Sequence, residues 1–223
     1  SSFAATPMPE YIYGRNPVVE ARRGRRRVLR ELTVEEAGAA ELERLCGSPD
    51  HQGIVAEVEP YPYVNADSLL AADDALVLAL DQVQDPRNLG AICRSAEAAG
   101  AAGVVICERR ASGITGAVCK ASAGAVEHLP VARVRNLADW LIAARERGAW
   151  SYGADAVAAV DYRTLDLDGR SILVLGGEGS GLRPRVAEAC DELVRIPTTG
   201  RVGSLNVSVA AAVLAFAAAR VPG

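Results

Sequence analysis

The chain has 223 residues, which is more than one domain of modal size, so one large domain or two small ones are expected. Half of the residues are hydrophobic, which supplies a core and argues against disorder. The net charge of −4 argues against a nucleic-acid partner unless positive charge gathers locally. The five cysteines and two histidines have no metal-ligand spacing, so we expect no metal site and reduced thiols in a cytoplasmic protein.

Neither end of the chain has the pattern of a membrane segment. Residues 1–10 lack the charged and apolar regions of a signal peptide. The longest apolar run, residues 207–219, is too short to span a bilayer and is interrupted by Ser208. We therefore expect no membrane partner.

The first sixty residues have the pattern of a small α/β unit. Residues 14–23 and 33–46 are expected to be helices, the second beginning with a capping box formed by Thr33 and Glu36. Residues 53–59 alternate like a strand, and residues 60–65, with two prolines, are expected to be a linker. A basic run in this unit is either a solvated surface or an RNA contact; it consists of Arg22, Arg23, Arg25, Arg26, Arg27 and Arg30.

Beyond residue 67 short apolar strands alternate with helices. The expected strands are 76–81, 103–107, 129–134, 150–154, 171–175 and 193–196. The expected helices between them are 88–100, 114–121, 136–148 and 182–190. This alternation predicts an α/β fold with a mainly parallel sheet covered on both faces. The last expected helix, 205–219, is almost wholly apolar and should be buried against the sheet or a second subunit.

The first segment that could carry chemistry is DQVQDPRNLGAICR, residues 81–94. A strand ends at Asp81, Pro86 interrupts regular structure, and Asn88 is expected to cap a helix that carries Arg94 less than two turns later. Taken alone, the segment is best interpreted as an ordinary strand–loop–helix connection.

The second segment is LVLGGEGSGL, residues 173–182. Its glycines would let a ligand approach the backbone closely, although a plain tight turn explains them as well. The spacing is not that of a dinucleotide-binding loop, and no acidic residue follows at the distance that a ribose would need, which disfavours an NAD-dependent oxidoreductase. Glu178 would repel a phosphate and suits a positively charged ligand.

The third segment is IPTTGRVGSLNVSV, residues 196–209. Ser204, Asn206 and Ser208 alternate with apolar residues where the last helix should begin. Ser204 is expected to be the N-cap of that helix. Asn206 is then expected to be buried near a glycine-bearing loop, and a buried amide needs a partner, so it is a candidate site residue.

In this order and spacing the three segments resemble the motifs of the SpoU/TrmH branch of the SPOUT methyltransferases. The resemblance covers residues 76–220 and rests on Asn88–Ala96, Leu175–Leu182 and Ile196–Ser208, with a secondary match at Lys120–Ala125. Near the N-terminus, Tyr13-Gly14 and the HQGI sequence at residues 51–54 resemble the L30e-like RNA-binding module of the 23S rRNA guanosine 2′-O-methyltransferases. From residue 14 to 51 this module is about one strand–helix unit shorter than its relatives: either it is truncated or a segment is missing.

The resemblance implies a fold and its ligands. It implies a small RNA-binding domain (residues 1–60), a linker (61–70) and a methyltransferase domain (71–223) with a deep trefoil knot near its C-terminal end. The cofactor would be S-adenosylmethionine, held largely by backbone groups of Gly176, Gly177, Ile196 and Leu205. The family dimerises through the knotted domain with the active site at the interface, which implies a homodimer.

The resemblance also implies an activity, which is methyl transfer to a ribose 2′-hydroxyl of RNA, with a guanosine of 23S rRNA as the expected target. The implied catalytic residues are Arg94, assisted by Asn88, Glu178, Ser204 and Asn206. Because a guanidinium stays protonated in proteins, we expect Arg94 to stabilise the developing alkoxide rather than to act as a base. A tRNA target, an antibiotic-resistance rRNA target, or an inactive RNA-binding ribosome-assembly factor are the alternatives.

Overall fold

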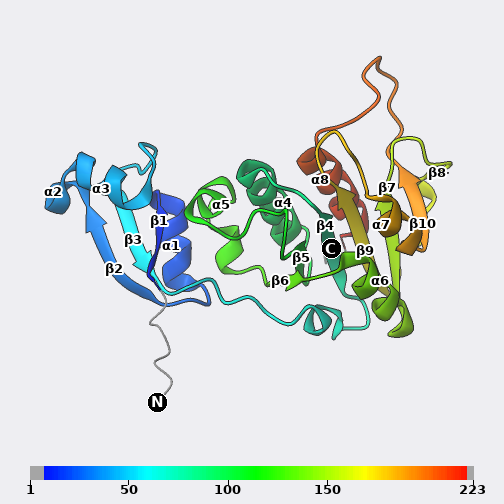
Figure 1. Ribbon diagram of the computed structural model, residues 1–223, viewed down its shortest axis with the longest axis horizontal. Coiled ribbons are helices and arrows are strands. Elements are labelled where there is room, and N and C mark those ends of the chain that lie inside the picture. Colours follow the sequence, from blue (N-terminus) through cyan, green and yellow to red (C-terminus); the bar gives the residue numbers. More distant parts are fainter. Residues whose placement is uncertain (1–7, 220–223) are drawn as a thin grey trace.

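The computed structural model describes residues 8–219. Most of the segment in which no signal peptide was found, and Arg220 at the end of the motif resemblance, lie outside this range. The chain builds two sheets that follow one another along the long axis of the molecule (Figure 1). No helix in the range 8–219 is long and apolar enough to cross a membrane.

The smaller sheet has three antiparallel strands in the order β1-β3-β2. Its unit contains β1 (Glu10–Tyr13), α1 (Arg15–Arg23), β2 (Val28–Thr33), α2 (Val34–Ala37), α3 (Ala39–Cys46) and β3 (Ile54–Val58). The helix expected over 14–23 is therefore present and begins one residue later, and the strand expected over 53–59 is present and is one residue shorter at each end.

The helix expected over residues 33–46 is divided. Gly38 lies between α2 and α3 with φ of 79°, a conformation that interrupts an α-helix. Thr33 belongs to β2, and the carboxylate of Glu36 accepts a hydrogen bond from the Thr33 backbone N–H at 2.9 Å, as the capping box predicts. Strands β1 and β2 were missed because one is only four residues long and the other carries charged residues in its middle.

The larger sheet has seven strands in the order β6-β5-β4-β9-β7-β10-β8, and all its recorded pairings are parallel. The strands are β4 (Leu76–Asp81), β5 (Gly103–Cys107), β6 (Val131–Val134), β7 (Ala149–Ala154), β8 (Val160–Asp161), β9 (Arg170–Gly176) and β10 (Glu192–Arg195). The helices are α4 (Pro86–Ala98), α5 (Gly116–Ala121), α6 (Leu137–Glu146), α7 (Pro184–Ala189) and α8 (Val207–Ala218), with 3₁₀ turns η1 (Ala66–Leu70), η2 (Ala125–Glu127) and η3 (Tyr162–Thr164). The mainly parallel α/β sheet is confirmed; only the two-residue β8 was not expected.

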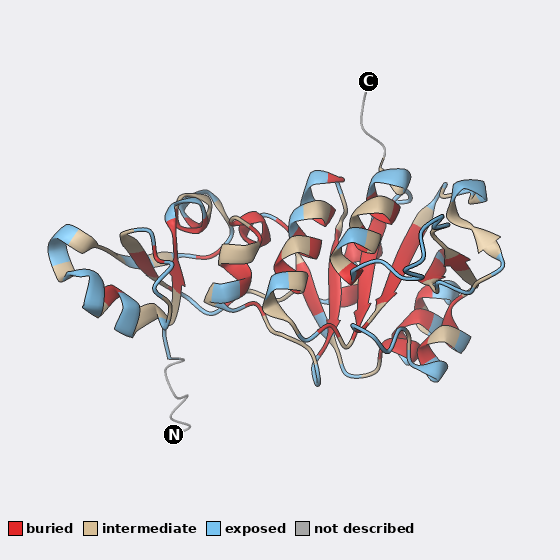
Figure 2. Ribbon diagram, turned by 90° about the horizontal axis from the view of Figure 1, so that it is seen from above, coloured by how far each residue is buried: buried red, intermediate tan, exposed pale blue. Residues whose placement is uncertain are grey.

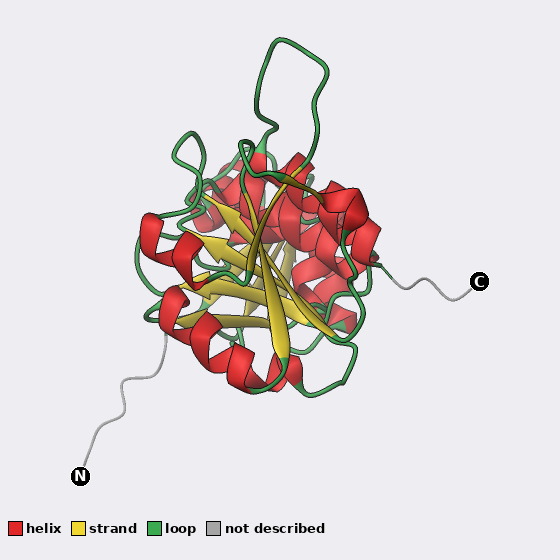
Figure 3. Ribbon diagram, turned by 90° about the vertical axis from the view of Figure 1, so that its right-hand side faces the viewer, coloured by secondary structure: helices red, strands yellow, loops and turns green. Residues whose placement is uncertain are grey.

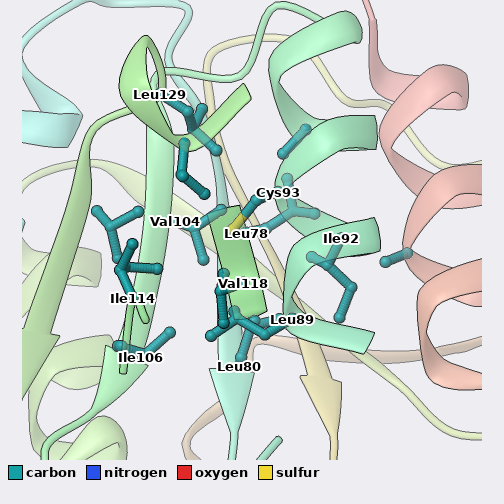
Figure 4. Close-up of a cluster of buried hydrophobic side chains, with 14 of the residues drawn as sticks. Leu78, Leu80, Leu89, Ile92, Cys93, Val104, Ile106, Ile114, Val118 and Leu129 are labelled. Carbon is teal, nitrogen blue, oxygen red and sulfur yellow. The ribbon is translucent and has the colours of Figure 1, made fainter. Parts of the chain in front are cut away.

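Helices cover both faces of this sheet because side chains alternate along each buried strand. Leu78 and Leu80 of β4 pack with α4, α5 and α8, as the close-up in Figure 4 shows for α4 and α5. Val77 and Ala79 point to the opposite face, where they pack with α6 and α7. The strands are the most continuously buried part of the molecule (Figure 2). At the centre of the sheet, Leu78 pairs with Leu173 of β9.

Helix α8 lies against α4 and β9, with one face exposed. Its buried residues are Val207, Ala211, Leu214 and Ala215. Val209 and Phe216 are 48% and 52% exposed, so the expected burial holds within this chain for one face only. The long loop before α8, residues 196–206, extends beyond the sheet in Figures 1 and 3.

A buried ion pair joins the two sheet units at a contact that we call the seam, made by Arg26, Tyr61, Cys119 and Glu127. The side chains of Arg26 and Glu127 are each 1% exposed, with 2.7 Å between Arg26 Nη2 and Glu127 Oε1. Arg26 Nη2 also donates to Cys119 Sγ at 3.1 Å, and the Tyr61 hydroxyl is within 2.8 Å of the Val126 carbonyl oxygen. The seam therefore places charged groups in the interior, each with a partner.

The basic run is thus divided between structural and exposed positions. Arg26 belongs to the seam, while Arg22 pairs with Glu31 and Arg23 with Glu20. Arg27 and Arg30 are exposed, and neither has an ion pair with any residue of the described range. A uniform RNA-contacting surface over all six arginines is therefore the wrong interpretation of this run.

Candidate active site

The three sequence segments converge at the carboxyl edge of the large sheet. Asn88 Nδ2 donates a short hydrogen bond to Glu178 Oε1. Asn206 Nδ2 donates to Asn88 Oδ1 at 3.2 Å. Residues from the segments after β4, after β9 and before α8 are thereby linked in one chain of hydrogen bonds, although 90 and 118 positions separate the bonded pairs in sequence.

The two amides in this chain have a defined orientation. The backbone N–H and hydroxyl of Ser208 donate to Asn206 Oδ1 at 2.8 and 2.6 Å. That oxygen is therefore an acceptor, which leaves Asn206 Nδ2 to donate to Asn88 and Asn88 Nδ2 to donate to Glu178. This series of hydrogen bonds ends on the carboxylate of Glu178, whose second oxygen, Oε2, has no hydrogen bond from any described residue.

Two expectations about these asparagines are wrong in detail. Helix α4 begins at Pro86 with Asp85 as its N-cap, so Asn88 lies within the first turn and its side chain is free to bond across the site. Asn206, not Ser204, is the N-cap of α8, and it is exposed rather than buried. Capping of helix α8 explains why polar residues stand at 206 and 208, because Asn206 Oδ1 accepts from Ser208 in the first turn. The amide nitrogen of Asn206 is left to donate to Asn88.

A cleft of about 400 Å³ lies beside this chain of hydrogen bonds, between the loop after β9 and the loop before α8. Its lining includes all four residues expected to bind the cofactor: Gly176, Gly177, Ile196 and Leu205. Glu178 and Ser204 also line it. The volume lies in the range of small-molecule sites.

Glycine is required at the base of this cleft because backbone segments approach very closely. A Cβ atom at Gly176 would lie 2.1 Å from the Gly181 carbonyl carbon. A Cβ atom at Gly177 would lie 2.9 Å from the Gln82 carbonyl oxygen. Any side chain would force the loop away from the end of β4, so these two glycines bring the loop, β4 and the cleft together.

An ion pair that the sequence did not reveal, between the buried Asp81 and the exposed Arg183, holds the same loop. Asp81, at the end of β4, is 1% exposed. Its carboxylate accepts from the Arg183 backbone N–H at 2.8 Å and from Arg183 Nε at 2.7 Å. Arg183 is the N-cap residue of α7, directly after the glycine loop. The hydrogen bond to the Asp81 carboxylate, together with its negative charge, raises the pKa of the Arg183 guanidinium.

Asp155 is a second cleft residue that sequence reasoning missed. It follows β7 and lines the cleft. The available signal was its position directly after an expected strand, at the edge where the glycine loop also lies. Among the residues of the described range, Asp155 and Glu178 supply the only charged side chains in the lining, and both are acidic.

Arg94 stands apart from the other candidate residues. It is exposed near the middle of α4, and it makes no hydrogen bond or ion pair with any residue from 8 to 219. It is not among the residues that line the cleft. Its guanidinium is thus free to bind a partner that comes from outside the chain. Ser204 is likewise exposed and lies in the cleft lining.

Comparison with known proteins places this geometry in a family. The sequence pattern of the SpoU rRNA Methylase family matches residues 75–216. The chain belongs to the SpoU/TrmH family of methyltransferases. A second pattern, RNA 2′-O ribose methyltransferase substrate binding, matches residues 29–64.

Relatives of this SpoU-family chain extend over most of its length. YacO of Bacillus subtilis, named as a TrmH-family tRNA/rRNA methyltransferase, is 39% identical over 234 residues, covering 93% of this chain and 94% of YacO. A TrmH-family tRNA/rRNA methyltransferase of Staphylococcus saprophyticus is 41% identical over 191 residues, covering 83% of this chain and 76% of that one. The YacO alignment is longer than the 223-residue chain, so YacO contains residues with no counterpart here.

Solved structures agree with this SpoU-family fold. The SpoU methyltransferase AviRb from Streptomyces viridochromogenes, in complex with AdoMet, has a TM-score of 0.80 at 27% identity and covers 95% of this chain and 89% of its own. An AdoMet-bound rRNA methyltransferase from Sinorhizobium meliloti has a TM-score of 0.81 at 27% identity, covering 95% and 87%. Both sheet units therefore have counterparts within single relatives.

Proposed function

We propose that this chain methylates the ribose 2′-hydroxyl of a guanosine in 23S rRNA. As a SpoU/TrmH-family protein it is an RNA 2′-O-methyltransferase that uses S-adenosylmethionine. The proposal concerns its target and the residues that act. The observation that carries the assignment of residues is the hydrogen-bonded chain from Glu178 through Asn88 to Asn206 beside the acidic cleft.

The cleft suits the cofactor in shape and charge. Gly176 and Gly177 leave no side chain at the base, and Ile196 and Leu205 provide apolar walls. S-adenosylmethionine supplies a methyl group activated by its sulfonium charge. We propose that backbone groups of these four residues hold it, with the Glu178 carboxylate near the positive charge.

The proposed catalytic roles follow from which side chains are hydrogen-bonded within the protein and which are not. Asn88 fixes one oxygen of Glu178, Asn206 in turn fixes Asn88, and both are positioning residues. Arg94 carries a free positive charge and would stabilise the alkoxide that develops as the 2′-hydroxyl loses its proton to water and its oxygen takes the methyl group from the cofactor's sulfur. We assign to Ser204 a hydrogen bond to the reacting ribose, a role that its position in the cleft lining supports.

The small sheet unit is proposed as the RNA-binding domain, covering the chain up to about residue 60, with 61–70 as linker and the rest as catalytic domain. The match to a substrate-binding pattern at residues 29–64 supports this division. The HQGI sequence at residues 51–54, which resembles the 23S rRNA enzymes, favours rRNA over tRNA. The curated relatives carry names that include both RNAs.

The knot and the homodimer are parts of the same proposal. The chain runs from β10 near one edge of the sheet back across its carboxyl end to place α8 beside α4. This return path supports the proposed C-terminal trefoil knot. The exposed apolar residues Val209 and Phe216 on α8 would be covered by a second copy. Replacing Phe216 with Asp should convert dimer to monomer in sedimentation velocity, whereas an unchanged dimer would place the interface elsewhere.

The test of the target is transfer of radiolabelled methyl from S-adenosylmethionine to purified rRNA and tRNA pools, with the position mapped by reverse-transcription stops. We expect label at a guanosine of 23S rRNA and none with the Arg94→Ala variant. Label in tRNA would keep the chemistry and overturn the rRNA assignment. Binding of RNA without label in any pool, including partly assembled ribosomes, would favour an inactive assembly factor.

A further inference from the structure

The cofactor cleft has a one-sided charge. Asp155 and Glu178 line it, and no arginine, lysine or histidine of the described residues does so. The nearest basic residue on β10, Arg195, donates through Nη1 to the carbonyl oxygen of Ala158 at 2.8 Å and is not part of the lining. The cleft therefore presents two negative charges to its ligand without a compensating cation.

Asp155 is held in place by hydrogen bonds that leave half of its carboxylate unused. The Val157 N–H donates to Asp155 Oδ1 at 2.9 Å, and the Asp155 N–H donates to the Val194 carbonyl oxygen at 2.9 Å. The backbone of Asp155 is thus bonded to β10, and its side chain closes a turn with Val157. Oδ2 has no hydrogen bond from the described part of the chain, although the residue is half-buried.

The cofactor and its product differ in charge. S-adenosylmethionine carries a sulfonium, whereas the S-adenosylhomocysteine that remains after methyl transfer has a neutral thioether in the same place. Fixed negative charges in a partly enclosed site favour the more positive of two ligands of nearly equal shape. The binding contacts of the adenosine and amino-acid ends are common to both ligands and cancel in the comparison.

We infer that Asp155 is a specificity-determining residue that makes the cleft bind the sulfonium cofactor in preference to the thioether product. The inference concerns the cofactor only and is independent of which RNA is methylated. Like Glu178, Asp155 has one carboxylate oxygen bonded within the chain and one free, so its negative charge adds to that of Glu178 in the cleft. Discrimination of this kind limits product inhibition.

The test is calorimetric binding of three ligands to the Asp155→Asn variant. They are S-adenosylmethionine, S-adenosylhomocysteine, and sinefungin, in which a carbon bearing a protonated amine replaces the methylated sulfur of the cofactor. Asparagine keeps an oxygen to accept the Val157 N–H, so the change removes charge rather than the turn. We expect the affinity for the two cationic ligands to fall about fivefold relative to the affinity for the neutral product.

The control is Asp50→Asn, which removes an exposed acid in the small sheet unit and should leave all three affinities unchanged. Equal losses for the three ligands in Asp155→Asn, or no loss, would overturn the inference. If that variant fails to fold, Asp155→Ser keeps an acceptor for the turn. In the wild type, raising the salt concentration should lower the ratio of the affinity for S-adenosylmethionine to that for S-adenosylhomocysteine. A ratio that does not change with salt would also count against the inference. Wild-type protein that binds none of the ligands would instead contradict the cofactor assignment.

Discussion

The seam and the cleft both place charged groups between packed elements, but they satisfy those groups differently. In the seam, Arg26 and Glu127 are almost completely buried and are bonded to each other and to neighbouring groups. In the cleft, Asp155 and Glu178 each have one oxygen bonded within the chain and one without a partner. The seam is a closed network, whereas the cleft is an incomplete one.

The difference separates charges that stabilise the fold from charges that bind a ligand. A buried charge is tolerated only when its hydrogen-bonding capacity is filled by the protein. A carboxylate that keeps an oxygen free can bind an outside group without first breaking an internal bond. Variants should therefore affect stability at the seam and ligand binding or turnover at the site.

The largest effect is expected at the seam. Glu127→Ala leaves Arg26 buried without its principal partner, which should lower the free energy of unfolding by about 3–5 kcal/mol. Urea unfolding followed by circular dichroism measures this loss. Arg27→Ala, at the neighbouring exposed position, should have little effect. The double variant Arg26→Met, Glu127→Leu should recover much of the loss, and a double variant as unstable as the single one would show that the pair itself contributes net stability.

At the site, Arg94→Ala should lower kcat about 10²–10³-fold, the usual effect of losing a group that stabilises an oxyanion. Arg94 does not line the cleft, so the Kd for S-adenosylmethionine should stay within about twofold of wild type. Single-turnover kinetics and calorimetry give the two quantities. An Arg94→Lys variant with near-normal turnover would contradict a requirement for the planar guanidinium.

Alkaline pH should lower the free energy of unfolding through two buried thiols, one of which lies in the seam. Burial raises the pKa of Cys93 and of the seam residue Cys119 to about 12. In the unfolded chain both thiols titrate near pH 9. The stabilisation of the folded state by the protonated thiols is therefore complete below pH 9 and is lost as the pH rises toward 12. Between pH 8 and 10 we expect a loss of about 1 kcal/mol for each thiol. Urea midpoints measured at both pH values should fall, and Cys93→Ala should reduce the fall; equal midpoints would contradict the raised pKa values.

The smallest effect is expected from the exposed arginines next to the seam. Arg27→Gln combined with Arg30→Gln should weaken RNA binding and lower the dependence of log K on log salt by about 2, without changing protein stability. Filter binding over a range of salt concentrations measures the slope. If the slope is unchanged, these arginines are a solvated surface, and the proposed RNA contact lies on other residues.

The large sheet was predictable because its strands are short apolar runs with clear alternation of strands and helices. Leu76–Asp81 and Gly103–Cys107 agree with the expected bounds at both ends. The small sheet was harder, because β2 carries Arg30 and Glu31 in its middle, has no buried residue, and is a strand through its pairing with β3. The alternation of apolar and polar residues cannot reveal a strand such as β2, which forms because it pairs with a neighbouring strand.

The candidate site was predictable as a set of residues but not as a geometry. Asn88, Glu178 and Asn206 were identified from motif order, and Asn88 is hydrogen-bonded to each of the other two. The N-cap assignments failed because Asp85 and Asn206 compete for that role with residues of equal intrinsic preference. Asp155 was missed because a lone acid after a strand is indistinguishable from a surface residue until the fold brings the glycine loop beside it.

The pairing of Leu78 with Leu173 has a consequence for how the chain is made. The central strand β4 leaves the ribosome about 95 residues before its neighbour β9, a delay of roughly 5–20 s at ordinary synthesis rates. Throughout that interval one long edge of β4 has no partner, and the apolar surface of the half-built sheet is exposed. Pairings of such long range are also slow to form. The nascent chain is therefore most prone to aggregation in the middle of its synthesis, and a fragment ending before β9 should require a chaperone to stay in solution.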